Sequence, residues 1–300
     1  MIRMHADELD IDSALVRRLL ATQFPHWAGE AIQPVLSAGT DNALFRLGRD
    51  KVVRLPRIHW AAGQPGWEQQ WLPRLAPRVP LPIPVPLALG EPAAGYPFNW
   101  SIGPWLPGKS AAVAQPVDLA DLAKDLASFV VALHRIETTD GPPRPDRGGR
   151  GAPLAERHAE VRAALRDLGG LIDTTAAAAA WESALAAPEW EGAPVWLHGD
   201  LQPGNLLVRR GRLAAVIDWG ALAVGDPACD LMPAWTMFAG ESRAAFRDAT
   251  RADDTTWARA RGWALSVALI ALPYYLHTNL VQVTLSRRAI AEVLAEAQPH

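Results

Sequence analysis

The segment from residue 196 to residue 220 combines the residue types that phosphate chemistry requires. It reads W-L-H-G-D-L-Q-P-G-N-L-L-V-R-R-G-R-L-A-A-V-I-D-W-G. Asp200 and Asn205 lie on a loop that contains proline and glycine, and the turn at Arg210-Gly211 predicts a hairpin that returns Asp218 to the level of Asn205. Two carboxylates and an amide oxygen are ligands that suit a hard cation such as Mg²⁺, and phosphate would complete its coordination.

The order of these residues resembles the catalytic segment of kinases. His198-Gly199-Asp200, followed by Asn205, matches the pattern in which the aspartate is the base and the asparagine a metal ligand. Asp218 opens D-W-G, in the place of the metal-binding Asp-Phe-Gly. Protein kinases have arginine at the position of Gly199. The glycine form resembles the aminoglycoside phosphotransferase family, which shares its fold with protein kinases and choline kinase.

A second motif extends the resemblance. The run G-D-P-A-C-D-L at 225–231 is also similar to that family, and the similarity covers the chain from about Ser37 to about Tyr275. The resemblance implies that Asp200 orients and deprotonates an acceptor hydroxyl, while Asn205 and Asp218 hold the Mg²⁺ that bridges nucleotide phosphates. It also implies structural roles for His198, which braces the loop, and for Asp230, which hydrogen-bonds to the loop backbone.

The resemblance places the nucleotide, ATP or GTP, in the first third of the chain. Ser37, Gly39 and Thr40 lie in a turn between two expected strands, where the family has its phosphate-covering loop. Arg54 stands on the third strand, where kinases place a lysine that binds phosphates, and Glu68 on the following helix is its natural partner. Arginine is a planar fork and not a simple replacement for lysine, so this site departs from the kinase pattern.

The segment from Phe98 to Gly108, F-N-W-S-I-G-P-W-L-P-G, resembles the strand and hinge that precede the helical part of kinases. By that alignment, the carbonyl of Pro104 accepts from the adenine amino group and the N–H of Leu106 donates to the ring. Proline fits the first role because only its carbonyl is needed.

The elements expected before residue 106 form an antiparallel sheet with one inserted helix. A first helix begins at Asp12 or Ser13 and ends near Ala21, and Gln64–Leu75 is the second. A proline-rich stretch, Pro77–Pro86, cannot be helical. The predicted strands are Ile32–Ser37, Ala43–Leu47, Lys51–Leu55, Val85–Leu89 and Phe98–Leu106.

After Pro116 the pattern becomes helical, and a Gly/Pro/Arg-rich loop at Gly141–Gly151 interrupts it. One short island with β character, Val195–Asp218, carries the motif, with Leu206–Val208 expected to pair with Leu213–Ile217. The expected helices are 119–133, Leu154–Leu168, Thr174–Ala186, Asp230–Ala239 and Thr255–Leu272.

Composition excludes several functions. The 29 basic and 32 acidic residues give a net charge of −3, so no field of one sign marks a nucleic-acid binder. A single cysteine, Cys229, allows no intramolecular disulfide and no cysteine zinc cluster, which fits a reducing compartment. The acidic start, Met1 to Asp12, is not a secretory signal, and the apolar run Ala264–Leu276 is too short for a membrane span. We expect a cytoplasmic protein.

The acceptor pocket of such folds belongs to the helical part, and a polycationic aminoglycoside needs a strongly acidic one. From Leu231 to His300 there are six acidic and seven basic residues, so no acidic patch is present. The count favours a neutral or apolar hydroxylated acceptor. Aromatic residues are plentiful in this part, and most are expected in the core: Trp235, Phe238, Trp257, Trp263, Tyr274 and Tyr275.

We therefore expect a two-lobed, protein-kinase-like α+β fold. Residues 1–105 would form an N-terminal nucleotide-binding lobe around the antiparallel sheet, and residues 106–300 a mainly helical lobe with the catalytic loop and acceptor site. The leading hypothesis is a Mg²⁺-dependent O-phosphotransferase that moves the γ-phosphoryl group of ATP or GTP to an antibiotic-like acceptor. The alternatives are a metabolite kinase of the same fold, similar to choline or homoserine kinase, and a non-catalytic, pseudokinase-like nucleotide binder. A metal-dependent phosphohydrolase would need more clustered Asp and His ligands.

Overall fold

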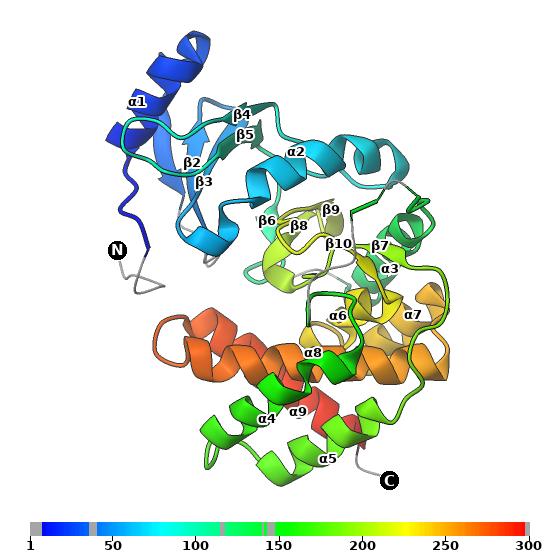
Figure 1. Ribbon diagram of the computed structural model, residues 1–300. Helices are drawn as coiled ribbons and strands as arrows, with labels where there is room; N and C mark the ends of the chain where they lie inside the picture. Colours follow the sequence, from blue (N-terminus) through cyan, green and yellow to red (C-terminus); the bar gives the residue numbers. More distant parts are fainter. Residues whose placement is uncertain (1–7, 36–40, 115–117, 140, 143–147, 298–300) are drawn as a thin grey trace. The chain divides into compact units, whose positions relative to one another are not determined.

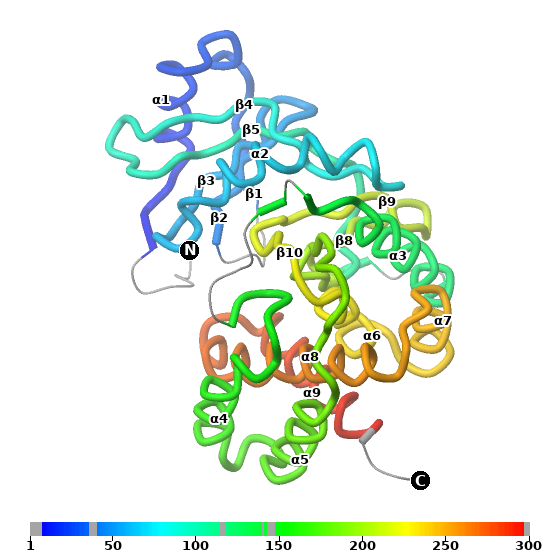
Figure 2. Tube along the Cα trace, turned by 45° about the vertical axis from the view of Figure 1, so that its right-hand side comes forward, coloured from blue at the N-terminus to red at the C-terminus, as the bar shows by residue number. Residues whose placement is uncertain are grey.

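The chain folds as two compact units. The computed structural model describes residues 8–35, 41–114, 118–139, 141–142 and 148–297. The first unit is formed by the described parts of 1–108 and 214–220, and the second by those of 109–213 and 221–300. Figure 1 labels the helices and strands, and Figure 2 follows the path of the chain.

The first unit contains a five-stranded antiparallel sheet with the order β1-β2-β3-β5-β4. A short turn at residues 48–50 joins β2 to β3, whereas α2 lies in the chain between β3 and β4. This is the predicted meander with its inserted helix. The strands are β1 (Ile32–Val35), β2 (Asn42–Leu47), β3 (Lys51–Pro56), β4 (Ala88–Gly90) and β5 (Trp100–Pro104), and the helices are α1 (Ser13–Gln23) and α2 (Gln64–Leu75).

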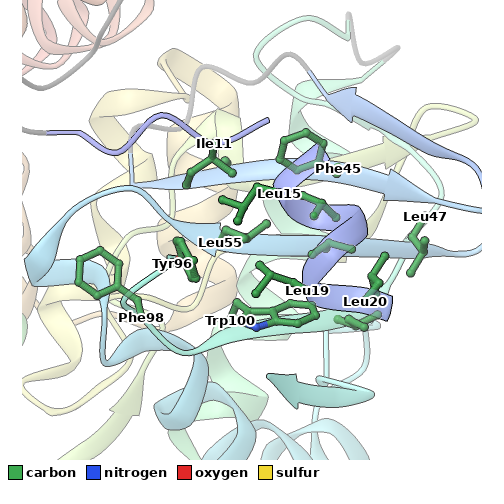
Figure 3. Packing of buried hydrophobic residues seen from close by; sticks show 14 residues of the cluster. Ile11, Leu15, Leu19, Leu20, Phe45, Leu47, Leu55, Tyr96, Phe98 and Trp100 are labelled. Atoms are coloured by element: carbon green, nitrogen blue, oxygen red, sulfur yellow. The ribbon is translucent and has the colours of Figure 1, made fainter. Parts of the chain in front are cut away.

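The core of the first unit lies between α1 and the sheet (Figure 3). Asp12 caps α1 by accepting a hydrogen bond from the backbone N–H of Leu15, as expected from the sequence. Leu19 and Leu20 are fully buried there, and burying each such side chain contributes roughly 1.5–3 kcal/mol. Trp100 of β5 closes the same core. The cluster thus fixes β3 and β5, the strands that carry predicted nucleotide-binding residues.

Helix α2 has the predicted bounds and is followed directly by a 3₁₀ turn, Ala76–Arg78. The expectation that no helix occurs in Pro77–Pro86 is therefore wrong at its first two residues. The predicted strand Val85–Leu89 is also shifted, because β4 begins only at Ala88. The prolines before it have no N–H to donate, so the first strand-like bond comes from Leu87, whose N–H lies 2.7 Å from the carbonyl of Ile102.

The second unit is mainly helical. Aspartate side chains cap three of its helices, Asp118 on α3, Asp173 on α5 and Asp253 on α8. Helices α8 and α9 pack along each other, and α7 packs against α3 (Figures 1 and 2). The helices are α3 (Leu119–His134), α4 (His158–Asp167), α5 (Thr174–Leu185), α6 (Pro233–Thr236), α7 (Gly240–Thr250), α8 (Asp254–Tyr275) and α9 (Leu280–Ala297).

Short strands lie within the motif segment and next to it in the fold. β7 (Val195–Leu197) pairs with β10 (Ala223–Gly225), and β6 (Lys109–Ser110) pairs with β8 (Leu206–Arg209). β9 (Arg212–Val216) follows β8 after a turn in which Arg210 and Gly211 both have positive φ. The two predicted hairpin strands are thus present to within one residue, whereas β6 and β10 were not predicted.

Two helices were missed, α7 and α9, and the predicted helix Asp230–Ala239 is divided. Its first residues belong to a 3₁₀ helix, Pro227–Leu231, and only Pro233–Thr236 is α-helical. Pro227 and Pro233 each stand at the first position of a new turn, where the missing N–H costs nothing. Among the described residues, no helix is both long and apolar enough to cross a membrane.

Candidate active site

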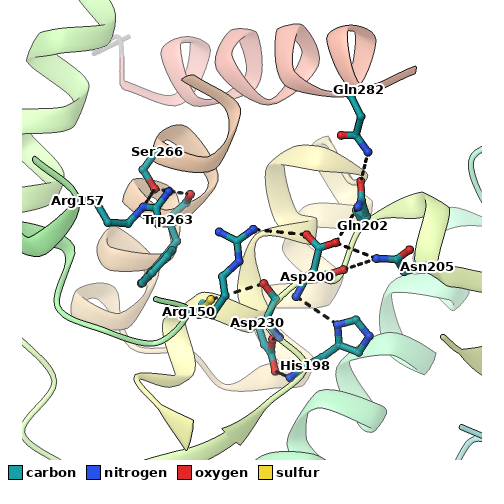
Figure 4. A network of polar contacts seen from close by, with 12 residues as sticks. Arg150, Arg157, His198, Asp200, Gln202, Asn205, Asp230, Trp263, Ser266 and Gln282 are labelled. Atoms are coloured by element: carbon teal, nitrogen blue, oxygen red, sulfur yellow. Dashed lines mark hydrogen bonds and ion pairs between the residues drawn. The ribbon is translucent and has the colours of Figure 1, made fainter. Parts of the chain in front are cut away.

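Among the described residues, the side-chain hydrogen bonds to the Asp200 carboxylate all reach one of its two oxygens. Its Oδ2 accepts hydrogen bonds from Nε2 of Gln202 at 2.8 Å and from Nδ2 of Asn205 at 3.0 Å. The same Nδ2 lies 2.9 Å from the carbonyl oxygen of Asp200. With Oδ2 engaged by two N–H donors, Oδ1 is the oxygen left to accept a proton from a third group. Figure 4 shows this arrangement.

Buried groups hold the backbone on which Asp200 stands. The Asp230 carboxylate is fully buried and accepts from the backbone N–H of His198 at 2.9 Å and of Gly199 at 2.8 Å. His134 Nε2 lies 3.3 Å from the same carboxylate. The ring of His198, also fully buried, accepts from the Asp200 N–H at 3.2 Å. Hydrogen bonds to a buried carboxylate are strong, so this backbone is rigid.

Gly199 is required by the geometry of the loop. Its φ is +79°, and a Cβ at this position would lie 2.3 Å from the carbonyl oxygen of Ala221. Any side chain would therefore meet both backbone strain and a backbone atom. The departure from the protein-kinase Arg at this position thus has a local structural reason.

Three residues of the network around Asp200 had no predicted role, namely Gln202, Arg150 and Gln282. Nη2 of Arg150 lies 3.6 Å from Oδ1 of Asp200, and Nε2 of Gln282, on α9, lies 3.2 Å from Oε1 of Gln202 (Figure 4). Nothing in the sequence distinguishes Arg150 from the other two arginines of its Gly/Pro/Arg-rich segment. Gln282 lies on a helix that sequence reasoning missed. Both contacts depend on tertiary structure.

In the first unit, Arg54 of β3 pairs with Glu68 of α2. Nη1 donates to Oε2 at 2.5 Å, and the glutamate side chain is only 1% exposed. Burial raises the pKa of the Glu68 carboxyl, and the charge and hydrogen bond of Arg54 oppose that rise. For Arg54, burial opposes ionisation, but attraction to Glu68 and Asp218 outweighs it and raises the guanidinium pKa. The pair is a buried, charged connection between strand and helix.

Asp218 belongs to the same polar cluster. Its Oδ1 lies 3.6 Å from Nη2 of Arg54 and accepts from Nε2 of Gln64 at 3.2 Å. Gln64 also accepts from Asn42 and donates to Glu68. Sequence reasoning missed Gln64, although it stands four residues before Glu68, a spacing that places both on one helix face.

The backbone of Asp218 is in the left-handed region, with φ at +65°. That conformation costs a non-glycine residue roughly 1–2 kcal/mol, and aspartate tolerates it better than most residues. Gly220 follows, and a Cβ there would lie 2.7 Å from Nε2 of Gln64. The glycine therefore leaves room for the amide that contacts Asp218.

The two predicted metal ligands, Asn205 and Asp218, lie in the second and first units respectively. Their donor atoms suit Mg²⁺, which prefers carboxylate and amide oxygens. Asn205 makes its bonds to Asp200 through Nδ2, which leaves its amide oxygen for another ligand. The Asp218 side chain is 43% exposed. Within the described residues, no group of three or more His, Cys, Asp or Glu side chains is arranged to hold a metal ion.

The remaining predicted nucleotide-binding residues fall in two places. Ser37, Gly39 and Thr40 lie outside the described residues. Pro104 is the last residue of β5, opposite Lys51 of β3, and Leu106 follows the strand. Both side chains are half-buried. Their roles toward a nucleotide stay predictions.

Most aromatic side chains of the helical part are core residues, as expected. Trp235, Phe238 and Trp263 are fully buried, and Trp257 is nearly so. The two tyrosines are the exceptions, because Tyr274 has 53% of its surface exposed and Tyr275 is only half-buried.

Comparison with known proteins identifies relatives. The family described as "Phosphotransferase enzyme family" matches residues 33–263. No curated protein matches the chain by sequence.

Several solved structures have the same fold. The GDP complex of wild-type aminoglycoside 2'-phosphotransferase-IIIa has a TM-score of 0.76 and 20% identity, covering 96% of this chain and 100% of that one. The GDP and kanamycin complex of a related aminoglycoside phosphotransferase has a TM-score of 0.75 and 20% identity, covering 94% and 99%. The macrolide 2'-phosphotransferase MphH from Brachybacterium faecium has a TM-score of 0.60 and 26% identity, covering 94% and 99%. The expected α+β, kinase-like fold is confirmed.

Proposed function

Because the chain belongs to the phosphotransferase enzyme family, we propose that it transfers the γ-phosphoryl group of ATP or GTP to a hydroxyl group of a small, antibiotic-like molecule. In this proposal, residues 1–105 bind the nucleotide and residues 106–300 carry the catalytic loop and acceptor site, except that 214–220, which include Asp218, fold with the first unit. The observation that carries the proposal is the one-sided fixing of Asp200, whose Oδ2 is bound by Gln202 and Asn205 while Oδ1 faces away from both.

Asp200 acts as the base. Oδ1 accepts the proton of the acceptor hydroxyl as the new O–P bond forms and the bond from the γ-phosphorus to the leaving diphosphate breaks. The proton ends on Asp200 and the electron pair on the nucleoside diphosphate. The bonds from Gln202 and Asn205 hold the carboxylate in one rotamer, so the base is in position before the hydroxyl arrives. His198 and Asp230 support the loop and do not take part in proton transfer.

Asn205 and Asp218 would hold Mg²⁺, which would supply charge neutralisation for the nucleotide phosphates. Arg54 contacts the phosphates from β3, with Glu68 fixing its orientation, and Ser37, Gly39 and Thr40 cover them. Pro104 and Leu106 bind the adenine or guanine edge through backbone groups. The GDP and ADP complexes of the structural neighbours support a nucleotide donor.

The decisive experiment measures nucleoside diphosphate release with Mg²⁺ and ATP or GTP. The acceptors are aminoglycosides, macrolides, other hydroxylated antibiotics and small amino alcohols. The control variant is Asp200→Asn, which keeps the size of the side chain and removes its basicity. We expect one acceptor class to stimulate release, and the variant to lower kcat at least about 100-fold with nucleotide affinity changed only a few-fold.

Each outcome separates the candidates. Substantial turnover in Asp200→Asn would show that Asp200 is not the base. Stimulation only by small amino alcohols would favour a metabolite kinase of the same fold. Mg²⁺-dependent nucleotide binding without release for any acceptor would favour the non-catalytic nucleotide binder, which the substitution of lysine by Arg54 motivates. Absence of nucleotide binding would contradict the proposed function altogether.

A further inference from the structure

The oxygen of Asp200 that is left for the acceptor faces a cation. Oδ1 lies 3.6 Å from Nη2 of Arg150, and this distance exceeds a hydrogen bond. The side chains are 28% and 22% exposed respectively, so both are accessible to a small molecule but only partly screened by water. The guanidinium therefore acts on Oδ1 through its charge without occupying the oxygen (Figure 4).

Arg150 is held in place by the backbone on both sides of it. Gly148 N–H donates to Oε2 of Glu156 at 2.8 Å, and the Gly148 carbonyl accepts from Nη1 of Arg157 at 2.7 Å. On the other side, the Gly151 carbonyl accepts from the N–H of Asp226 at 2.9 Å. Arg157 is itself fixed by a bond from Nε to Ser266 Oγ. The backbone on each side of Arg150 is thus fixed within the second unit, and the guanidinium contacts Asp200 from it.

The other side chains that contact Asp200 carry no charge. Oδ2 is bound by the amides of Gln202 and Asn205, and Gln282 extends this amide chain from α9. Asp230 is the other aspartate labelled in Figure 4, but it is fully buried and engaged by backbone N–H groups. Among the described contacts around Asp200, the one carboxylate that a positively charged group of an acceptor could approach is that of Asp200 itself. Arg150 already faces this carboxylate.

We propose that Arg150 determines the acceptor specificity of this site, by selecting against a hydroxyl that has an ammonium group beside it. The inference rests on the proposed function and deepens it. An acceptor whose hydroxyl reaches Oδ1 places its neighbouring atoms within a few ångströms of Nη2. At such distances, in a partly desolvated site, like charges repel strongly. A hydroxyl on a neutral or anionic part of the acceptor meets no such penalty.

The test compares acceptors with and without their positive charges. Each amine-bearing acceptor, such as kanamycin or glucosamine, is paired with its fully N-acetylated form, which keeps the hydroxyls and removes the positive charges. The selectivity is the ratio of kcat/KM for the amine to that for its acetylated form. The variants are Arg150→Gln, Arg150→Lys and a control, Arg162→Gln, which alters an exposed arginine on α4 of the same unit.

We expect the wild type to favour the acetylated form and Arg150→Gln to raise the ratio by about tenfold or more, mainly through a lower KM for the amine. The ratio for Arg150→Lys should stay within about threefold of wild type, because lysine keeps the positive charge. The ratio for Arg162→Gln should stay within the same range, because this arginine is an exposed residue of α4. A purely structural role would lower turnover of both forms equally. Thermal unfolding checks that each variant is folded.

Two results would overturn the inference, and they are distinguishable. If the wild type transfers phosphoryl groups but Arg150→Gln leaves the ratio unchanged, Arg150 does not set specificity and the proposed function stands. If folded wild type transfers to no acceptor of either charge, the proposed function fails and the inference fails with it. An equal gain in Arg150→Gln and Arg150→Lys would also contradict it, because the effect would then not depend on charge.

Discussion

The guanidinium of Arg54 joins Glu68 to Asp218. Nη1 lies 2.5 Å from the Glu68 carboxylate, and Nη2 of the same group lies 3.6 Å from the Asp218 carboxylate. One cation on β3 therefore faces a carboxylate from α2 and another from the motif segment, all within the first unit. Replacing it removes charge compensation from both acidic groups.

Arg54→Ala is expected to lower the free energy of unfolding by about 3–5 kcal/mol, because it leaves Glu68 buried without its partner. It should also weaken nucleotide binding at least about tenfold. The double variant Arg54→Met/Glu68→Leu removes both charges and should recover most of the stability without recovering nucleotide affinity. Chemical denaturation and calorimetry measure the two effects. Unchanged nucleotide affinity in a folded Arg54 variant would show that this arginine does not contact phosphate.

Two glycines of the catalytic loop give a matched pair for stability. Gly199→Ala places a Cβ 2.3 Å from a backbone oxygen at a φ of +79°, whereas a Cβ on Gly204 meets nothing within 4 Å. We expect Gly199→Ala to cost about 2 kcal/mol or more, and Gly204→Ala to stay within about 0.5 kcal/mol. Thermal and denaturant unfolding of both variants test this. Equal stability of the two would mean that the loop does not need its left-handed turn.

Asp218→Asn tests the metal assignment. Asparagine tolerates positive φ and keeps the size of the side chain, so the fold should be retained. Loss of the carboxylate charge should raise the Mg²⁺ concentration for half-maximal turnover about tenfold or more. Chelation of Mg²⁺ should stop turnover of the wild type, and added Mg²⁺ should restore it. The control is Asp50→Asn, an exposed aspartate of the same unit. If turnover depends on the Mg²⁺ concentration identically in both variants and the wild type, Asp218 is not a ligand of the metal.

Cys229 is predicted to be unreactive in the folded protein. Burial raises the pKa of its thiol to about 12, an effect that Arg150 partly opposes. At pH 8 Ellman's reagent should label it only in denaturant. Because the pKa of the thiol is higher in the folded chain than in the unfolded chain, the stability of the fold depends on pH. Above pH 9 the unfolded chain loses a proton that the folded chain keeps, so this thiol lowers stability as the pH rises from 9 to 12. Rapid labelling without denaturant would contradict the burial, and Cys229→Ser is the control for background reaction.

The parts of the site that could be predicted are those with linear patterns. Asp200 and Asn205 stand five residues apart in one motif, and the resemblance to a family extended the prediction to Asp230. Arg150 and Gln282 could not be found in this way, because they reach the site only through the folding of a loop and of a helix. Gln64 is intermediate, since its spacing from Glu68 was visible and its contact with Asp218 was not.

The secondary structure, like the site, could be predicted where a linear pattern determines it. Helices with a clear apolar face, such as α2 and α3, were predicted to within one residue at each end. Prediction missed α7 and α9, and it misplaced boundaries at β4 and around Pro233. In the latter two places the missing N–H groups of prolines moved the boundary, and periodicity is insensitive to that effect.

The hydrogen bonds of Asp230 link the position of Asp200, the proposed base, to the packing of the helical unit. Asp230 stands in the 3₁₀ helix Pro227–Leu231, among fully buried neighbours, and its two oxygens hold the backbone directly before Asp200. A core substitution that shifts this short helix would therefore displace the carboxylate of Asp200 before it unfolds the protein. A substitution in the core around residues 227–231 is thus expected to act on turnover as well as on folding.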